Sequence, residues 1–327
     1  MNKKVFLFVT VVAILITIIS ACAPSSAAEP EVVVEQAVEE VLVGKGAETE
    51  ALAFTDDLGN VIELDDNPEA IVSLSPSTTE ILFAVGAGGQ VSGRDEMSLA
   101  PEAALSVPSV GAMWGDLPAE AILAAEPDLI FVAEIINEDQ VQAMQDLGLQ
   151  VFWQANPTTF EELWDNLREI GSVTGHEDAA EVLIAELQAR VENVVSAVAD
   201  AEERPSVFYE LDATDPSNPW TAGSGTFIDL IISTAGGTNA AADLQGDYAQ
   251  MSAEALIAAD PDIIVLGDAP FGVTPKSVAQ RAGWENLTAV VNGDVYPFNP
   301  DILSIPGPRL VEGLEEMARI LQPDLFP

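Results

Sequence analysis

The pattern of apolar positions alternates between two periods along the chain. Short apolar runs that predict strands occur at residues 70–74, 129–133, 150–153, 206–211, 263–266 and 295–298. Between them, apolar residues recur every three or four positions, which is typical of amphipathic helices. Strands that alternate with helices form parallel sheets, so we predict an α/β fold. A turn at residues 57–60 predicts a hairpin at the start of the folded part.

One helical segment is longer than an ordinary crossover helix. Residues 176–204 contain neither Pro nor Gly, and Gly175 and Pro205 flank them. A helix of that length would span roughly 40 Å at ~1.5 Å per residue. We therefore predict a single rigid helix at 176–204 that joins an N-terminal α/β lobe at 54–175 to a C-terminal α/β lobe at 205–327.

The first residues carry the pattern of an export signal. Lys3 and Lys4 precede an apolar run at 5–16, and small residues lead to Cys22. The run is shorter than the ~20 residues of a membrane-spanning helix. The stretch from Ile19 to Cys22 resembles a lipobox, so we expect a lipoprotein signal at 1–22 and lipidation of Cys22. An ordinary signal with an incidental cysteine is the alternative.

Composition restricts the classes of partner. Residues 23–53 begin with Pro, Ser and Ala, continue with acidic and small residues, and are interpreted as a flexible acidic tether, with a short helix possible around 34–42. The whole chain has 54 acidic and 11 basic residues, a net charge of −43. Nucleic-acid binding needs a basic surface, so this class of partner is excluded. The single Cys excludes an intrachain disulfide.

A duplicated unit connects the two predicted lobes. Residues 118–132 align with residues 252–266 at a constant offset of 134, and eight of fifteen positions are identical. Each copy is a short helix that ends at Pro127 or Pro261, followed at once by a buried strand. The two copies lie on either side of the long helix, which indicates that the lobes have related folds.

These features resemble a known family. The sequence is similar to the periplasmic binding proteins of cobalamin, haem and ferric-siderophore ABC importers. The matching motifs are residues 71–80, both copies of the repeat, residues 283–287 and 295–298, and Pro-Gly-Pro-Arg at 306–309. The resemblance covers residues 54–327. It implies two Rossmann-like lobes with parallel sheets, joined by one long rigid helix, with a ligand cleft between them. It also implies a permease and an ATPase as partners, an extracytoplasmic location and no enzymatic activity; we expect a monomer.

The resemblance gives a role to one acid in each copy of the repeat. Glu120 and Glu254 occupy equivalent places in the first turn of their helices. The helix dipole favours an acid there, which by itself explains either residue. In the family, the aligned glutamates dock onto arginines of the permease, one from each lobe.

Candidate ligand-binding residues lie near predicted strand ends. Ser77 and Thr78 open a helix directly after a strand, where open α/β sheets bind ligands, and Ser77 with Glu80 has the spacing of a capping box. Met113 and Trp114, Trp220 and Tyr248 are assigned to loops, where aromatic side chains can contact a large ring system. Three other tryptophans are expected in the core: Trp153, Trp164 and Trp284.

Basic residues near the cleft loops are limited to Arg94 and Arg309. Arg309 could bind an anionic or polar ligand group, cap a helix or pair with an acid. Because a strongly anionic siderophore calls for several arginines, the composition favours cobalamin or a related corrinoid.

Other ligands and functions remain as alternatives. Haem is possible with Tyr209 or Tyr248 as iron ligand, since the one histidine, His176, is expected at the start of the long helix. A ferric siderophore, or a surface interaction module without transport, are further alternatives. No cofactor or metal-binding cluster is predicted. Gly86–Gly89 follows a helix instead of opening it, which does not fit a dinucleotide site.

Overall fold

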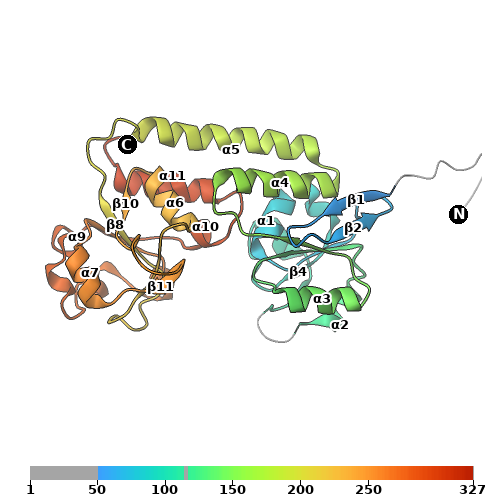
Figure 1. The fold of residues 1–327 in the computed structure, drawn as a ribbon, viewed down its shortest axis with the longest axis horizontal. Helices are drawn as coiled ribbons and strands as arrows, with labels where there is room; N and C mark the ends of the chain where they lie inside the picture. Colours follow the sequence, from blue (N-terminus) through green and yellow to red (C-terminus); the bar gives the residue numbers. More distant parts are fainter. Residues whose placement is uncertain (1–50, 114–116, 327) are drawn as a thin grey trace, which may run out of the picture. The chain divides into compact units, whose positions relative to one another are not determined.

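The computed structural model describes residues 51–113 and 117–326, and residues 49–327 form one compact unit. The predicted signal, Cys22 and most of the predicted tether lie outside the described residues, as does Trp114. Within this unit the chain forms two parallel-sheet α/β lobes (Figure 1). The fold class predicted from the sequence is therefore confirmed.

The first lobe is built on a five-stranded sheet with the order β5-β4-β3-β6-β7, and every neighbouring pair is parallel. Its strands are β3 (Ile71–Ser73), β4 (Val91–Asp95), β5 (Ser109–Gly111), β6 (Leu129–Ala133) and β7 (Val151–Gln154). Its helices are α1 (Pro76–Ala84), α2 (Ala119–Ala124), α3 (Glu138–Asp146) and α4 (Phe160–Thr174), with 3₁₀ turns η1 (Ala87–Gln90) and η2 (Glu102–Ser106). The predicted hairpin is confirmed as β1 (Leu52–Thr55) and β2 (Val61–Leu64). The strand order reverses between β3 and β6, which makes their carboxyl ends the expected ligand edge.

The second lobe repeats this plan in a four-stranded parallel sheet with the order β10-β8-β12-β13. Its strands are β8 (Ser206–Glu210), β10 (Thr238–Asn239), β12 (Ile263–Leu266) and β13 (Val295–Pro297). A separate antiparallel ribbon contains β9 (Trp220–Ala222) and β11 (Tyr248–Gln250). Its helices are α6 (Phe227–Thr234), α7 (Ala253–Ala259), α8 (Pro275–Val278), α9 (Thr288–Asn292), α10 (Asp301–Ser304) and α11 (Leu310–Leu321), with turns η3 (Ala269–Phe271) and η4 (Trp284–Asn286). Here the order reverses between β8 and β12.

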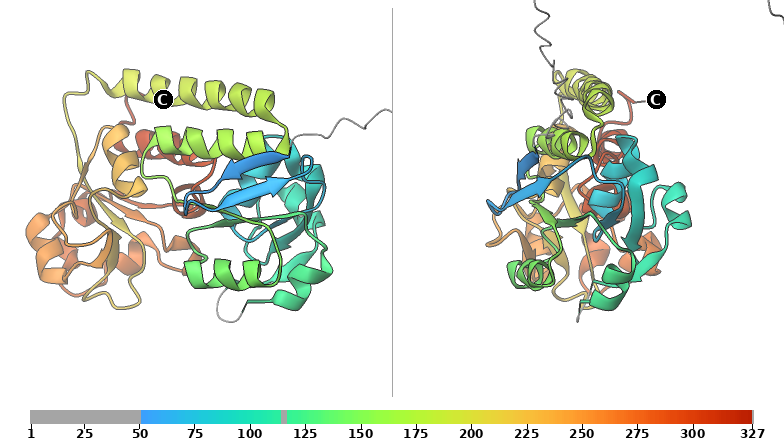
Figure 2. Two further views of the ribbon diagram at one scale, coloured as in Figure 1. Left: turned by 45° about the vertical axis from the view of Figure 1, so that its right-hand side comes forward. Right: turned by 90° about the vertical axis from the view of Figure 1, so that its right-hand side faces the viewer.

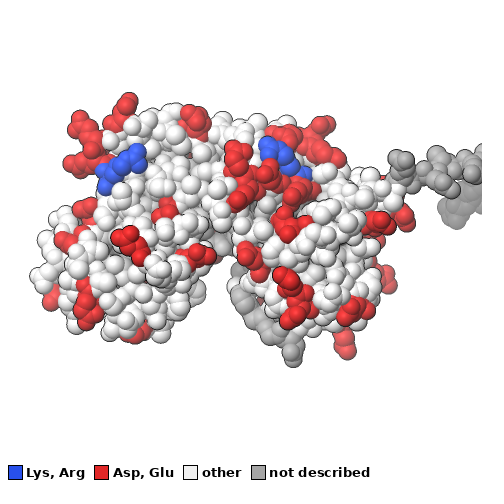
Figure 3. All heavy atoms as spheres, in the orientation of Figure 1, with Lys and Arg blue, Asp and Glu red and all other residues white. Residues whose placement is uncertain are grey.

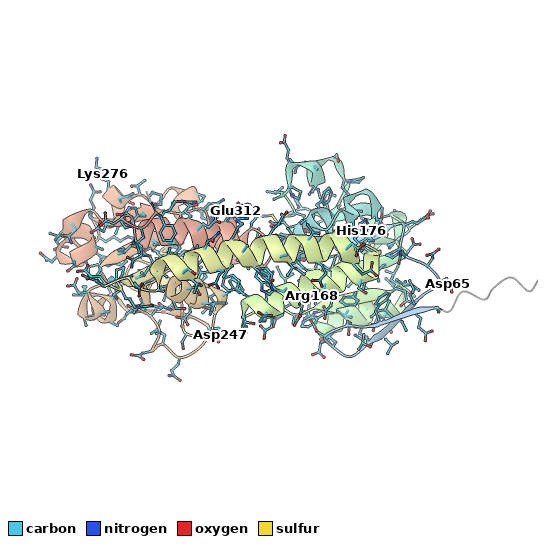
Figure 4. The ribbon with its side chains drawn as sticks, turned by 90° about the horizontal axis from the view of Figure 1, so that it is seen from above. Asp65, Arg168, His176, Asp247, Lys276 and Glu312 are labelled. Carbon is cyan, nitrogen blue, oxygen red and sulfur yellow. The ribbon has the colours of Figure 1, made fainter. Side chains whose placement is uncertain are left out.

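Helix α5 (Glu177–Val198) connects the lobes and is shorter than predicted. It begins after His176, as expected, but it ends at Val198, six residues before the predicted end at Arg204. The chain then continues to β8, which begins at Ser206. Arg168 of α4 pairs with Glu181 of α5 at 2.9 Å, and Arg190 of α5 pairs with Glu315 of α11 at 2.9 Å. Figures 1 and 2 show α4 and α5 side by side, and Figure 4 shows α5 lying over both lobes from His176 onwards.

One buried apolar cluster continues from the first lobe into the second beneath these helices. Phe160 of α4 meets Phe227 of α6 edge-on, with their ring centroids 5.4 Å apart. Each lobe also has a smaller core cluster of its own on the other side of its sheet. Trp164 and Trp284 are buried, as predicted, and Trp153 is partly buried with its indole N–H donating to the Ile136 carbonyl at 2.8 Å. The shared core and the charged links of α5 hold the two lobes in one unit.

The two copies of the repeat have the same unusual backbone. Each forms a helix and a strand beside the switch point of its sheet, α2–β6 in the first lobe and α7–β12 in the second. Glu126 and Asp260, at equivalent places after each helix, both adopt positive φ, +48° and +41°. This left-handed conformation is uncommon for residues other than glycine. Its occurrence at both junctions supports the internal duplication.

The aspartate that follows the proline in each copy of the repeat, Asp128 or Asp262, has the same structural role in both lobes. The Asp128 carboxylate accepts hydrogen bonds from the backbone N–H groups of Glu69 and Ala70, both at 2.9 Å. Asp262 accepts one from the N–H of Ser206 at 2.8 Å. In each lobe this aspartate therefore links the entry of the repeat strand to the entry of the neighbouring central strand.

Candidate functional site

Large apolar side chains are exposed where strands of the first sheet end. Met97 and Leu99 follow β4, and Ile135 follows β6. Because parallel strands have their carboxyl ends at one edge, these residues share the edge at which α/β sheets bind ligands. Sequence reasoning missed all three, since an apolar residue in a loop is by itself an ordinary feature.

The second lobe has three exposed aromatic residues: Phe271, which follows β12, and Trp220 and Tyr248, which lie in the antiparallel ribbon. Trp220 and Tyr248 line one hollow of about 480 Å³ together with Leu211, Asp212, Ile228 and Ser304, here called the aromatic hollow. A second hollow, also about 480 Å³, is lined by Leu211, Asp212, Ala213, Thr214, Asp268, Phe271 and Val273, and is called the Phe271 hollow. A larger groove of about 630 Å³ lies at the opposite, amino-terminal edge of this sheet and is not part of the candidate site.

The loop placement predicted for Trp220 and Tyr248 is wrong, because both residues belong to short strands, β9 and β11. In the antiparallel ribbon, Trp220 pairs with Gln250 and Tyr248 pairs with Ala222. The two aromatic residues are therefore diagonal neighbours on one face of the ribbon. The backbone of Trp220 is also held by Asp212, whose carbonyl accepts its N–H at 2.7 Å. The ribbon thus presents two aromatic side chains from a fixed backbone.

Ser77 and Thr78 lie in a buried hydroxyl network at the start of α1. The helix begins at Pro76, and Ser75 caps it by accepting the Thr78 N–H at 3.2 Å. The predicted capping box of Ser77 and Glu80 is therefore wrong: the cap lies two residues earlier, and Glu80 pairs elsewhere. Thr78 Oγ1 lies 2.7 Å from Ser73 Oγ and 2.8 Å from Ser75 Oγ, and its side chain is fully buried.

This burial bears on three predicted ligand contacts. Ser77 is 6% exposed and Thr78 is 0% exposed, so any contact with a ligand would be small in this structure. Met113 is also buried and packs in a core cluster of the first lobe, which argues against the ligand contact predicted for it. The adjoining Trp114 lies outside the described residues, so its contact stays a prediction.

Both arginines singled out from the sequence are engaged within the protein. Arg94 is 8% exposed and donates to the backbone carbonyls of Ala104 at 3.0 Å and Asp95 at 2.9 Å. Arg309 forms a two-point ion pair with Glu80, with Nε 3.0 Å from Oε2. Of the three roles left open for Arg309, the structure shows pairing with an acid.

The other basic side chains outside ion pairs do not lie at the strand ends. Among residues 51–113 and 117–326, the basic side chains outside any ion pair are Arg94, Arg204 and Lys276. Arg204 lines the groove at the amino-terminal edge of the second sheet. Figure 4 shows Lys276 at the margin of the second lobe, pointing away from the protein, and the face in Figure 3 carries many acids but few basic groups. The candidate site therefore contains acids and aromatic residues without a free cation in the described part.

A buried acidic pair lies at the switch point of the second sheet. Glu210 at the end of β8 is bound by both terminal nitrogens of Arg281, at 2.5 and 2.8 Å, and Asp268 follows β12. Burial raises the pKa of Glu210 to about 7, although Arg281 opposes the rise, and nearby Asp268 raises it further. Burial also raises the pKa of Asp268. Asp268 Oδ1 has no hydrogen-bond partner within the protein, whereas both carboxylate oxygens of Glu210 are bound by Arg281.

The exposed aromatic residues beside the hollows of the second lobe fit a protein that holds a ligand, and the comparison with known families agrees. Residues 71–301 match the model of the periplasmic binding protein family. The chain belongs to this family.

The relatives of this periplasmic binding protein differ in the ligands that their names give. A substrate-binding lipoprotein of an ABC transporter from Bacillus subtilis, YvrC, is 33% identical over 285 residues, covering 85% of this chain and 88% of the relative. A cobalamin-binding protein of Halobacterium salinarum is 31% identical, covering 79% of this chain and 70% of the relative. Among solved structures, the haem-binding protein RhuT of Roseiflexus has a TM-score of 0.70 at 26% identity, covering 79% of this chain and 99% of that one.

This protein is accordingly a substrate-binding component of an ABC importer, in a family that works outside the cytoplasm with a permease and an ATPase. The family captures solutes and is not a family of catalysts. Within the described residues no helix is long and apolar enough to cross a membrane. Nor do the described residues contain a cluster of three His, Cys, Asp or Glu side chains that could hold a metal ion.

Proposed function

We propose that this binding protein captures cobalamin or a related corrinoid at the strand ends of its lobes and delivers it to the permease. The observation that carries the proposal is the engagement of both nearby arginines, Arg94 by backbone carbonyls and Arg309 by Glu80. Carboxylate and phosphate groups are recognised best by free arginine side chains. With those arginines engaged, the site favours a ligand whose periphery is mainly uncharged.

A corrinoid has that chemistry. Its ring is large and its edge carries uncharged amides, which can hydrogen-bond to polar groups while the ring packs on aromatic faces. Trp220 and Tyr248 offer such faces in the aromatic hollow. A ferric siderophore with a strong negative charge would meet Asp212 there instead of a cation. The cobalamin-binding relative from Halobacterium supports the same choice.

Haem is the second candidate because one tyrosine is accessible. Of the two tyrosines considered as iron ligands, Tyr209 is fully buried and Tyr248 is 55% exposed in the aromatic hollow. A phenol at that position could bind ferric iron. The haem propionates, however, would have no free arginine among the described side chains of the site.

A ligand panel tests the proposed function. The mature protein is titrated with cyanocobalamin, haem and ferrichrome, and binding is followed by tryptophan fluorescence. We expect cyanocobalamin to bind at least about tenfold more tightly than the other two. Tight binding of haem or ferrichrome with cyanocobalamin above the high micromolar range would overturn the corrinoid assignment.

Delivery is proposed to use one glutamate from each lobe. Glu120 of α2 and Glu254 of α7 are both exposed, in the first turns of helices that Figure 1 shows on the side of the lobes away from α5. Neither takes part in an ion pair within the described residues. Their repeated placement supports docking to paired arginines of the permease. Lipidation of Cys22 would keep the protein at the outer face of the cytoplasmic membrane.

A further inference from the structure

Phe271 is exposed to an extent that calls for a physical reason. Its side chain is 84% exposed, more than any other large apolar side chain in the described part of the chain. Single exposed apolar residues are common and need no function. The position of Phe271 and the rigidity of its backbone distinguish it from the others.

The backbone around Phe271 is held in one tight turn. The Phe271 N–H donates to the Asp268 carbonyl at 3.0 Å, and the Gly272 N–H donates to the Ala269 carbonyl at 3.0 Å. Pro270 restricts the preceding φ, and Gly272 supplies a φ of +97° that other residues rarely adopt. A side chain on such a turn contacts a ligand with little loss of backbone entropy.

The turn is anchored to the central strands of the sheet. Asp268 is 4% exposed, and its Oδ2 accepts the Ala213 N–H at 3.1 Å. The Gly267 N–H donates to the Glu210 carbonyl at 2.8 Å. These bonds join the loop after β12 to the loop after β8, across the point where the strand order reverses. Phe271 therefore projects from the ligand edge of the second sheet.

The two hollows of this lobe share a wall. Leu211 and Asp212 line both the aromatic hollow and the Phe271 hollow. A ligand that packs against Trp220 and is larger than one hollow would extend over this wall to Phe271. A corrinoid ring with its amide arms is large enough, whereas a small solute is not.

We propose that the Phe271 hollow is a second ligand subsite, in which Phe271 packs against an uncharged apolar part of the same ligand that the aromatic hollow holds. Asp268 is a positioning residue for this subsite because it fixes the turn without being exposed itself. The acids Asp212 and Asp268 in its wall disfavour a carboxylate at this place. The identity of the ligand in this subsite rests on the proposed function, whereas the existence of the subsite does not.

Substitutions at Phe271 test the subsite. Affinities for cyanocobalamin, dicyanocobinamide and haem are measured by titration calorimetry for the wild type, F271A and F271W, with thermal unfolding to confirm the fold. We expect F271A to weaken cyanocobalamin binding about tenfold and F271W to stay within about threefold of the wild type. The control V291A removes an exposed apolar side chain that lines neither hollow, and should leave the affinity unchanged.

The role of Asp268 has its own test. D268A removes the acceptor of the Ala213 N–H and should weaken binding, whereas D268N keeps a carbonyl oxygen and should restore it. A purely structural role would lower the melting temperature of both variants without this rescue of affinity.

The outcomes separate the subsite from the proposed function. If the wild type binds cyanocobalamin and the affinity of F271A for it is within about twofold of the wild-type affinity, the subsite is overturned and the corrinoid function stands. If the wild type binds haem in preference and F271A loses that affinity, the corrinoid function is overturned and the subsite stands.

Discussion

Glu80 and Arg309 are 229 residues apart in the chain and form a two-point ion pair that joins the lobes. Glu80 lies in α1 of the first lobe, and Arg309 directly precedes α11 of the second. The side chain of Glu80 is 4% exposed and that of Arg309 is 25% exposed. Burial raises the pKa of Glu80, and the Arg309 guanidinium opposes that rise.

Removing one partner of this pair is expected to destabilise the protein. In R309M the buried carboxylate of Glu80 loses its counter-charge, which typically costs about 3 kcal/mol in the free energy of unfolding. The double variant E80M/R309M should recover most of that loss because neither buried charge remains. Urea unfolding of the wild type, both single variants and the double variant measures the effect. A loss below about 0.5 kcal/mol in R309M would show that the pair contributes little.

Reversing the two docking glutamates is expected to stop transport without affecting capture. E120R/E254R should bind the ligand like the wild type, while uptake through the cognate permease and ATPase falls at least about tenfold, since arginine would repel arginine at both contacts. The matched control is E161R/E177R, which reverses two exposed acids in the first turns of α4 and α5. Uptake by E120R/E254R equal to that of the control would contradict the docking proposal.

Stability is expected to depend on pH through Glu210. The pKa of this carboxyl is about 7 in the folded protein and near its ordinary value of 4.5 in the unfolded chain. The folded state therefore holds the proton more tightly, and this contribution to stability is complete below about pH 4.5 and is lost as the pH rises through about 7. E210Q removes the titration.

We expect the urea midpoint of the wild type to fall more steeply than that of E210Q between about pH 4.5 and 7. Carboxyls with raised pKa values away from Glu210, such as Asp95 and Glu169, contribute to both proteins equally. The difference between the two curves therefore reports Glu210 together with Asp268, whose pKa shift depends on it. Parallel curves would contradict the assignment.

Replacing Tyr248 separates the two candidate ligands. Y248F keeps the ring that packs in the aromatic hollow and removes the phenolic oxygen. If the ligand is a corrinoid, Y248F should bind it within about twofold of the wild type and Y248A should bind about tenfold more weakly. A ligand-to-iron absorption band that appears with haem and disappears in Y248F would support the haem alternative instead.

Much of the architecture follows from local patterns. The strand predicted at 129–133 is β6, and the strand predicted at 263–266 is β12, because a short apolar run next to a proline junction is a strong signal for a buried strand. Short elements with few apolar residues, such as β5 and β10, gave no comparable signal and were missed. The end of α5 was also misplaced, since no Pro or Gly before Pro205 indicates where the helix stops.

The candidate site was predicted only in part. Trp220 and Tyr248 are exposed beside one hollow, but in an antiparallel ribbon and not in the loops that the sequence predicts, and their ligand contacts stay a prediction. Phe271 was not distinguished from the other phenylalanines, because its exposure depends on a turn anchored to Ala213 from a different loop. Thr78 is buried for a similar reason: its hydroxyl bonds to Ser73 and Ser75 in the folded lobe.

The sequence by itself determined the alternation of strands and helices, the duplicated unit and the acidic character of the chain, since these are encoded by residues close together or by composition. Only the tertiary structure decided which charges meet. The sequence left Arg309 free to bind a ligand, cap a helix or pair with an acid. Folding brings Glu80 to it from another lobe, because a buried carboxylate is stabilised by a counter-charge that no nearby residue in its own helix supplies.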